Sequence, residues 1–422
     1  MTNELSALTE IASDAIDRYA ITPAQMLHVG IARRVFARVG VASTPTRLVH
    51  DHLATSAYSL TRAAVAGAAG ALATTLRAAS GEADVLPLSR SRGGRTVVGA
   101  INALAGDRLA QRRSDLTIQM AVRCAGIDVA CTSDGLAAAF PAATSRIAVF
   151  VHGLAETEEW WIRAQRGSRA RRASHFGARL REDAAYTPVH VRYNTGLHVS
   201  ENGAALSALL ESLVAAWPVA AQDLVLVGHS MGGLVIRSAA HMGTVAGHRW
   251  PARTRHVITL GTPHHGAPLA KAAHAASWAL HALPEAAPLA QLIDTRSAGI
   301  RDLRLGALHD DDWRDEPFDT FADRRRQIPL LAGCRYTFIT ATITNSPAHP
   351  MGWLLGDLLV RTESAAGRRG ERTISVDPEA VVHLGGLTHF NLLNHPQVYE
   401  VLLRAIAGPA VPGTRPPAQR GH

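Results

Sequence analysis

Five residues, Gly228-His229-Ser230-Met231-Gly232, fit the G-x-S-x-G pattern, in which a sharp turn lifts a serine above the end of a buried strand. A serine hydroxyl attacks a carbonyl at neutral pH only when a base removes its proton, so Ser230 needs a histidine within hydrogen-bond reach. The apolar residues 224–227 favour a strand, and residues 232–240 favour a helix. This setting favours a nucleophile elbow over the alternative, a glycine-rich turn with an inert serine.

The charge that develops during such a reaction also needs fixed partners. A tetrahedral intermediate carries negative charge on oxygen, which backbone amides held in place can stabilise. One amide should follow the nucleophile, here Met231, and the second should come from the loop after an earlier strand. "RIAVFVHGLAE", residues 146–156, ends an apolar strand at His152 and Gly153, so we expect the Leu154 amide to be the second donor. The same His-Gly pair is compatible with an ordinary turn.

The base should follow the serine in the chain, with an acid between them. His389 is the first candidate, because it lies in a glycine-led loop just before an amphipathic helix at the end of the chain. His395 precedes a proline at a helix start and is expected to be structural, and His383 lies in a strand-like segment. For the acid, Asp357 follows the seventh strand of the pattern, and Glu363 in the same loop is its rival.

Five segments occur in a familiar order: "VFVHG", "GHSMGG", "LGTPHHG", "GDLLVRTESA" and "GLTHFNLLNHP". They resemble the lipase and esterase branch of the α/β-hydrolase superfamily, near the GPI inositol-deacylase-like and bacterial triacylglycerol lipase groups. The resemblance covers about Leu116 to Ala407. It implies Ser230 as nucleophile, His389 as general base and Asp357 as the acid.

Two features of this resemblance concern single residues. "GDLLV" is similar to the D-G-x-V segment of the family, with Leu358 in place of the glycine. "GTPHHG", residues 261–266, is similar to the segment that lines the pocket mouth in these lipases, which implies that His264 and His265 lie in or behind the substrate pocket. We assign His152, Gly153 and His229 to the same pocket.

The elements that must position these residues alternate along the chain. Strand-like and helix-like segments follow one another after "DLTIQMAVR", and several strands are continuous apolar runs, which indicates strands buried on both faces of a parallel sheet. The expected fold class is α/β, with the α/β-hydrolase fold: a mostly parallel central sheet, helices on both faces, a helical lid insertion and an N-terminal helical segment. We place the helical segment at 1–113, the hydrolase domain at 114–408 and a flexible tail at 409–422.

The lid is expected at about residues 267–334. About 70 residues separate "GTPHHG" from "YTFITATIT", whereas connections in α/β units usually have roughly 2 to 6. Much of the insertion is apolar with helical spacing, which fits either a lid that meets acyl chains or an extra packed helix pair. In the N-terminal segment, "AAVAGAAGALATTL" is shorter than the roughly 20 residues of a membrane span, which favours a packed helix over a membrane-associated one.

Charge and cysteine content limit the partners. The net charge of +8 is almost wholly arginine, because Lys271 is the single lysine, and we expect no nucleic-acid binding. The arginine run from Arg163 to Arg181 fits either a solvated loop or a contact with anionic lipid. Three cysteines without a CxxC pair suggest neither disulfides nor a zinc site, and with an N-terminus unlike a secretory signal they favour a cytoplasmic location.

These residues predict a serine carboxylic-ester hydrolase that works through an acyl-enzyme, with no metal and no organic cofactor. Its substrate would be a small-molecule or lipid ester, and peripheral contact with a membrane stays open. The sequence does not indicate an oligomeric state. Two alternatives remain: an acyltransferase with the same three residues, and a non-catalytic binding protein on the same fold.

Overall fold

The computed structural model describes residues 4–40, 43–79, 88, 91–162, 175–267, 296–314, 326–346, 349, 356–369 and 372–408. The chain divides into two compact units. One comprises Met1–Gly94, Arg108–Thr117 and Lys271–Arg296, and the other comprises Arg95–Asp107, Ile118–Ala270 and Ser297–His422. The predicted tail lies outside the described residues, as do residues 268–295 and 315–325 of the predicted lid.

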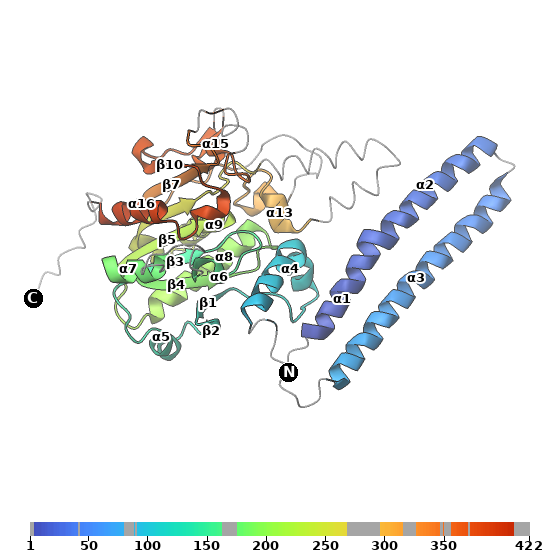
Figure 1. Ribbon diagram of the computed structural model, residues 1–422, viewed down its shortest axis with the longest axis horizontal. Helices are drawn as coiled ribbons and strands as arrows, with labels where there is room; N and C mark the ends of the chain where they lie inside the picture. Colours follow the sequence, from blue (N-terminus) through green and yellow to red (C-terminus); the bar gives the residue numbers. More distant parts are fainter. Residues whose placement is uncertain are drawn as a thin grey trace, which may run out of the picture. The chain divides into compact units, whose positions relative to one another are not determined.

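The first unit contains two long helical runs side by side (Figure 1). The elements are α1 (Glu4–Ile16), the π-helix η1 (Asp17–Ile21), α2 (Thr22–Val39) and α3 (Thr44–Ala79). Gly40, at φ 79°, follows α2 in a conformation that glycine adopts without strain. Each run contributes a small buried side chain, Ala32 from α2 and Ala54 from α3. Among the described helices, none has both the length and the hydropathy that crossing a membrane would need.

The second unit is built on a sheet. Within the described residues, eight strands form it in the order β10-β7-β6-β5-β3-β4-β1-β2. The strands are β1 (Ala121–Cys124), β2 (Ile127–Val129), β3 (Arg146–Val151), β4 (Thr187–Arg192), β5 (Asp223–His229), β6 (Thr254–Leu260), β7 (Arg335–Thr342) and β10 (Val381–Gly385). A separate antiparallel pair is formed by β8 (Arg368–Arg369) and β9 (Arg372–Thr373).

Along the sheet, the neighbouring strands β10, β7, β6, β5, β3 and β4 run parallel to one another. Strand β1 pairs antiparallel with both of its neighbours, β4 and β2. Residues 147–151 of β3 have no exposed surface. Their side chains alternate between two apolar clusters, with Val149 in one and Phe150 in the other. The continuous apolar runs of the sequence therefore correspond to strands covered on both faces.

Helices provide both covers. One cluster joins the sheet to α8 (Val199–Ala216) and α9 (Met231–Val245), and the other joins it to α7 (Phe176–Ala184) and α16 (Pro396–Ala407). The remaining helices are α4 (Arg92–Gln111), α5 (Ser133–Ala139), α6 (Glu159–Ile162), α10 (Trp250–Arg253), α13 (Ala298–Asp302), α15 (Thr362–Ala365), and the 3-10 turns η4 (Asp310–Asp312), η5 (Pro378–Ala380) and η6 (His389–Leu392).

This strand order and the helices on both faces confirm the predicted α/β-hydrolase fold. Helices α1, α2 and α3 confirm the predicted helical N-terminal segment. The parallel strands all end at one edge of the sheet, where ligands bind in open α/β sheets. Val151 of β3 pairs with Gly228 of β5, so His152 and His229 occupy equivalent positions at that edge. The candidate residues after β3, β5 and β7 meet there.

Candidate active site

Ser230 lies in the sharp turn between β5 and α9. Its backbone has φ 51° and ψ −122°, a conformation that non-glycine residues seldom adopt. The Ser230 amide donates a hydrogen bond to the Leu260 carbonyl (2.8 Å), and the Ser230 carbonyl accepts one from Gly233 (3.1 Å). Among the described residues the Ser230 hydroxyl has no hydrogen-bond partner, and the side chain is partly exposed. A strained backbone thus presents an unpaired hydroxyl at the sheet edge.

The glycines on either side of Ser230 are required by close packing. A Cβ atom at Gly232 would overlap the carbonyl oxygens of Val151 and His152, and one at Gly228 would lie 2.6 Å from the Gly233 nitrogen. Those atoms belong to the backbone and cannot rotate away. The pattern of small residues therefore corresponds to a bend in which helix and strand touch directly.

His389 and Asp357 form a buried hydrogen-bonded pair. His389 Nδ1 lies 2.7 Å from Asp357 Oδ2, and the His389 amide donates to the Asp357 carbonyl (2.9 Å). The other carboxylate oxygen, Oδ1, accepts hydrogen bonds from the amides of Leu359 (3.0 Å) and Val360 (2.8 Å). These bonds fix the orientation of the carboxylate and of the ring, so that Nδ1 donates to Asp357 and Nε2 carries the lone pair.

The other acid and histidine candidates lie elsewhere. Glu363 is exposed in the first turn of α15. His383 on β10 is hydrogen-bonded by both ring nitrogens to the hydroxyls of Thr340 and Thr342. His395 caps α16, where its Nδ1 accepts a hydrogen bond from the Gln397 amide. The structure brings Asp357, and not Glu363, to His389.

The turn after β3 approaches Ser230 closely. A Cβ atom placed on Gly153 would lie 3.0 Å from the Cβ of Ser230. In the described part of the chain, the backbone amides of Leu154 and Met231 donate no hydrogen bond to any protein group. Two unpaired N–H groups on either side of a partly exposed serine are the donors that an oxyanion hole requires.

The His152 side chain is hydrogen-bonded to the backbone of this turn and of the segment after β4. Its Nδ1 donates to the Gly153 carbonyl (2.9 Å), and its Nε2 accepts from the Tyr193 amide (3.3 Å). The ring stacks on Tyr193, with centroids 4.4 Å apart. Burial lowers the pKa of His152, so the side chain is neutral. With no exposed surface, His152 supports the predicted pocket and does not line it.

Glu156 is a site residue that the sequence alone did not single out. Its carboxylate accepts a hydrogen bond from the Gly153 amide (2.7 Å) and lies 2.9 Å from His229 Nδ1. The His229 ring is fully buried, and its Nε2 lies 3.2 Å from the carbonyl oxygen of His389. A signal existed, since "AETEEWW" places three acids directly after a buried strand, where carboxylates need partners.

His264 and His265 line a cavity of about 170 Å³, together with Arg237 and residues from β9. Its described lining includes neither Ser230 nor His389. The His264 ring packs on Phe338, with centroids 4.3 Å apart. Burial and the nearby Arg237 hold the pKa of His264 well below its ordinary value.

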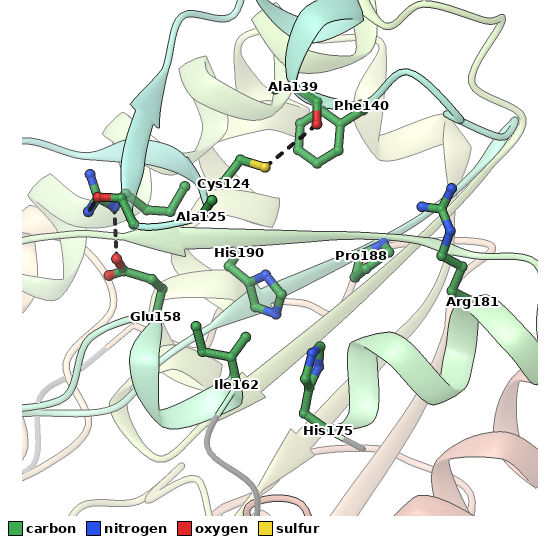
Figure 2. A pocket seen from close by; sticks show the side chains of 12 residues that line it. Cys124, Ala125, Ala139, Phe140, Glu158, Ile162, His175, Arg181, Pro188 and His190 are labelled. Atoms are coloured by element: carbon green, nitrogen blue, oxygen red, sulfur yellow. Dashed lines mark hydrogen bonds and ion pairs between the residues drawn. The ribbon is translucent and has the colours of Figure 1, made fainter. Parts of the chain in front are cut away.

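A second cavity, of about 280 Å³, lies beside β1, β4 and α7 (Figure 2). Figure 2 shows the His190 ring among its lining residues and Glu158 joined to an arginine, which is Arg123 at 2.8 Å. Burial and the neighbouring His175 lower the pKa of His190 to about 3, so His190 is neutral. The described lining contains no residue of the elbow or of the His389 pair, and this cavity is separate from the candidate active site.

Two arginines of the predicted run are described: Arg179, which is partly buried, and Arg181, which is exposed. The Arg179 guanidinium lies 3.5 Å from the centroid of the Tyr399 ring, and Arg181 donates to the Ala142 carbonyl (2.7 Å). Residues 163–174 of the run lie outside the described residues.

Residues 177–305 match the family model of the PGAP1-like alpha/beta domain. The match runs from α7 through the elbow to α13, so it lies on the sheet that carries Ser230. No curated protein matches the chain. The family match lies within the unit whose strand order shows the α/β-hydrolase fold.

Many solved structures are similar to the chain, including the following three. The mature lipase BlEst2 of Bacillus licheniformis has 20% identity and a TM-score of 0.37, over 61% of this chain and 90% of that one. Lipase B of Aspergillus fumigatus has 11% identity and a TM-score of 0.39, over 70% of this chain and 57% of that one. The phospholipase PlaB of Legionella pneumophila has 16% identity and a TM-score of 0.39, over 63% of this chain and 60% of that one. The chain thus spans about three fifths of the last two proteins.

Proposed function

We propose that the chain is a serine carboxylic-ester hydrolase that works through an acyl-enzyme. The observation that carries this proposal is the meeting of two features at one sheet edge: a strained elbow with an unpaired Ser230 hydroxyl, and a buried His389 oriented by Asp357 at 2.7 Å. The first supplies a nucleophile and the second a base with its orienting acid.

Each group would have one role in the reaction. His389 Nε2 would accept the Ser230 proton as Oγ attacks the ester carbonyl, and Asp357 would stabilise the imidazolium that forms. The amides of Leu154 and Met231 would hold the oxyanion. His389 would then protonate the leaving alcohol, and a water molecule activated by the same histidine would release the acid. No step requires a metal or an organic cofactor.

The substrate class follows from the proposed chemistry. Carboxylic esters of small molecules or lipids suit this set of groups, because an activated serine hydroxyl attacks an ester carbonyl and the leaving alcohol takes the proton back. The residues predicted to form a lid would select among acyl chains.

Replacing Ser230 by alanine tests the proposal. Because Ser230→Ala removes the atom that forms the acyl-enzyme, we expect kcat on a p-nitrophenyl ester to fall by about 10⁵- to 10⁶-fold. A fluorophosphonate probe should label the wild type covalently and leave the variant unlabelled.

A matched control is Ser238→Ala, in the same helix. The Ser238 hydroxyl donates to the Leu308 carbonyl (2.7 Å) and touches none of the reacting groups. This change should cost about 1 kcal/mol of stability and leave kcat within twofold. Activity that survives Ser230→Ala would refute the mechanism.

A further inference from the structure

Glu156 and His229 form a second carboxylate–histidine pair behind the reacting groups. Glu156 is 2% exposed and His229 has no exposed surface. His229 Nδ1 lies 2.9 Å from Glu156 Oε1 and 3.0 Å from Oε2, and the same Oε2 accepts the Gly153 amide at 2.7 Å. Every polar atom of the pair thus has a partner inside the protein.

The hydrogen bonds determine the charge of His229. Its Nδ1 faces a carboxylate and its Nε2 faces the His389 carbonyl, and both of these groups only accept hydrogen bonds. Both ring nitrogens must therefore donate, which makes His229 an imidazolium. Burial alone would lower the pKa of His229, but the charge and hydrogen bond of Glu156 outweigh it and the pKa is raised. Burial raises the pKa of Glu156, and His229 more than reverses this effect.

The pair connects three segments, each of which carries a reacting group. Gly153, bound by Glu156, precedes the Leu154 amide, and His229 precedes Ser230. The third segment is bound through the carbonyl of His389, whose ring is the proposed base. Distances among oxyanion donor, nucleophile and base thus depend on one buried ion pair.

We propose that Glu156 and His229 are positioning residues that hold the oxyanion turn, the elbow and the base loop in register for acyl transfer. This proposal rests on the proposed function. Neither side chain touches the substrate: the pair acts on Leu154, Ser230 and His389 through the backbone groups next to them. Its charge also acts on the base, because the His229 and His389 rings lie 4.7 Å apart.

The neighbouring acids show that burial in this turn does not by itself imply such a role. Glu158 binds the Arg123 side chain (2.8 Å), and Glu159 binds Arg95. Both carboxylates are 2% exposed, as Glu156 is, yet their arginines come from β1 and α4 and not from the elbow. The three acids are therefore equally buried, and they differ in the groups that their carboxylates bind.

The test is Glu156→Gln in the full chain, with Glu158→Gln as the matched control. Glutamine keeps an oxygen for the Gly153 amide but removes the charge, so His229, which burial favours as neutral, loses its Nδ1 proton and its ion pair with residue 156. We expect kcat to fall about 100-fold, the loss that small misplacements of catalytic groups produce, while KM changes less than threefold. Glu158→Gln should lower the melting temperature and keep the kcat of the wild type per folded molecule.

The pH profile gives a readout that a purely structural role would not move. The charged groups facing His389 are Asp357 at Nδ1 and the imidazolium of His229. Glu156→Gln removes the Glu156 anion and the His229 cation together, and the cation is the member of the pair whose ring adjoins His389, so we expect the acid limb of kcat/KM to move to higher pH in this variant. Glu156→Asp keeps the charge on a shorter side chain and should return the limb to the wild-type position with part of the kcat loss remaining.

Three outcomes would overturn the proposal. One is a Glu156→Gln enzyme with unchanged kcat and pH limb, and another is an equal loss in Glu158→Gln per folded molecule. If Glu156→Gln does not fold, Glu156→Asp decides, because wild-type kcat in that variant would show that the exact placement of the carboxylate is irrelevant. Inactive Ser230→Ala beside unaffected Glu156→Gln would refute the positioning role alone, whereas active Ser230→Ala would refute the proposed function.

Discussion

Two carboxylate–histidine pairs lie side by side at the edge of the sheet, and they differ in what the second ring nitrogen faces. In Asp357–His389 and in Glu156–His229, a buried carboxylate binds Nδ1 and accepts at least one backbone amide. The Nε2 atom of His229 is committed to a carbonyl, while that of His389 has no hydrogen-bond partner among the described residues. A histidine whose two nitrogens both donate to acceptors is held as an imidazolium, whereas one that donates only through Nδ1 keeps a free Nε2 that can accept a proton.

The largest effect should come from the acid of the Asp357–His389 pair. Asp357→Asn preserves the shape of the side chain but favours the wrong tautomer of His389, so we expect kcat to fall about 10⁴-fold. Steady-state kinetics on the same ester measures the loss. Glu363→Gln is the comparison, because Glu363 is exposed and lies in the same loop. A loss of several orders of magnitude in Glu363→Gln, with little change in Asp357→Asn, would assign the acid the other way.

The Glu156–His229 pair should be visible in the pH dependence of stability. The pKa of native His229 is raised above 6.5, so its stabilisation is complete below that pH and declines as pH rises through the native pKa. The pKa of native Glu156 lies below 4.5, so its stabilisation is lost as pH falls through that native value. The free energy of unfolding of the wild type minus that of Glu156→Gln should therefore be largest near pH 5 to 6, at roughly 3–5 kcal/mol. Urea unfolding between pH 4 and 9 measures this difference, and a difference independent of pH would mean that the pair is not charged.

His152 provides the opposite case at the equivalent strand position. Because its native pKa is lowered, the unfolded chain binds a proton below pH 6.5 that the native state does not, and stability falls as pH decreases. The partner, and not the depth of burial, thus sets the charge of a histidine at this edge.

The smallest effect concerns the backbone beside each acid. Leu358, next to Asp357, has φ 87°, and Ala155, next to Glu156, has φ 61°. The positive φ of Leu358 explains why the family that this chain resembles has glycine at the position, since glycine adopts such an angle without strain. Leu358→Gly and Ala155→Gly should each raise the free energy of unfolding by about 0.5–1 kcal/mol, as measured by urea unfolding. A clear loss of stability in either variant would show that the side chain contributes more than the strain costs.

The elbow could be predicted from the sequence because its geometry is local. Gly228 is required by a contact within one strand–turn–helix unit, Gly232 is required by the neighbouring end of β3, and the apolar run before them marks the strand. Asp357 was expected from its place after the seventh strand, and Glu363 remained a rival because spacing cannot say which side chain turns inward. The structure places the first against His389 and leaves the second exposed.

Glu156 could not be assigned in the same way. Its partner His229 is 73 residues away, and two identical side chains lie within three positions of it. Which of the three acids meets His229 depends on where Arg95 and Arg123 lie, and both arginines precede the turn by many residues. The pocket role predicted for His264 and His265 likewise could not be derived from the sequence, because it depends on how the turn after β6 folds. In the structure, this turn places the His264 ring against Phe338 of β7.

The bond between Arg95 and Glu159 ties the start of α4 to the turn that carries Leu154. Resemblance to known hydrolases begins only at about Leu116, which suggests that the earlier residues are an appendage. A fragment cut at that point would still contain every proposed reacting group, yet it would lack Arg95, which the buried Glu159 carboxylate binds. Removing one partner of a buried ion pair costs roughly 3–5 kcal/mol. A stable fragment of the second unit is therefore expected to start upstream of Arg95, inside sequence that carries no recognisable hydrolase motif.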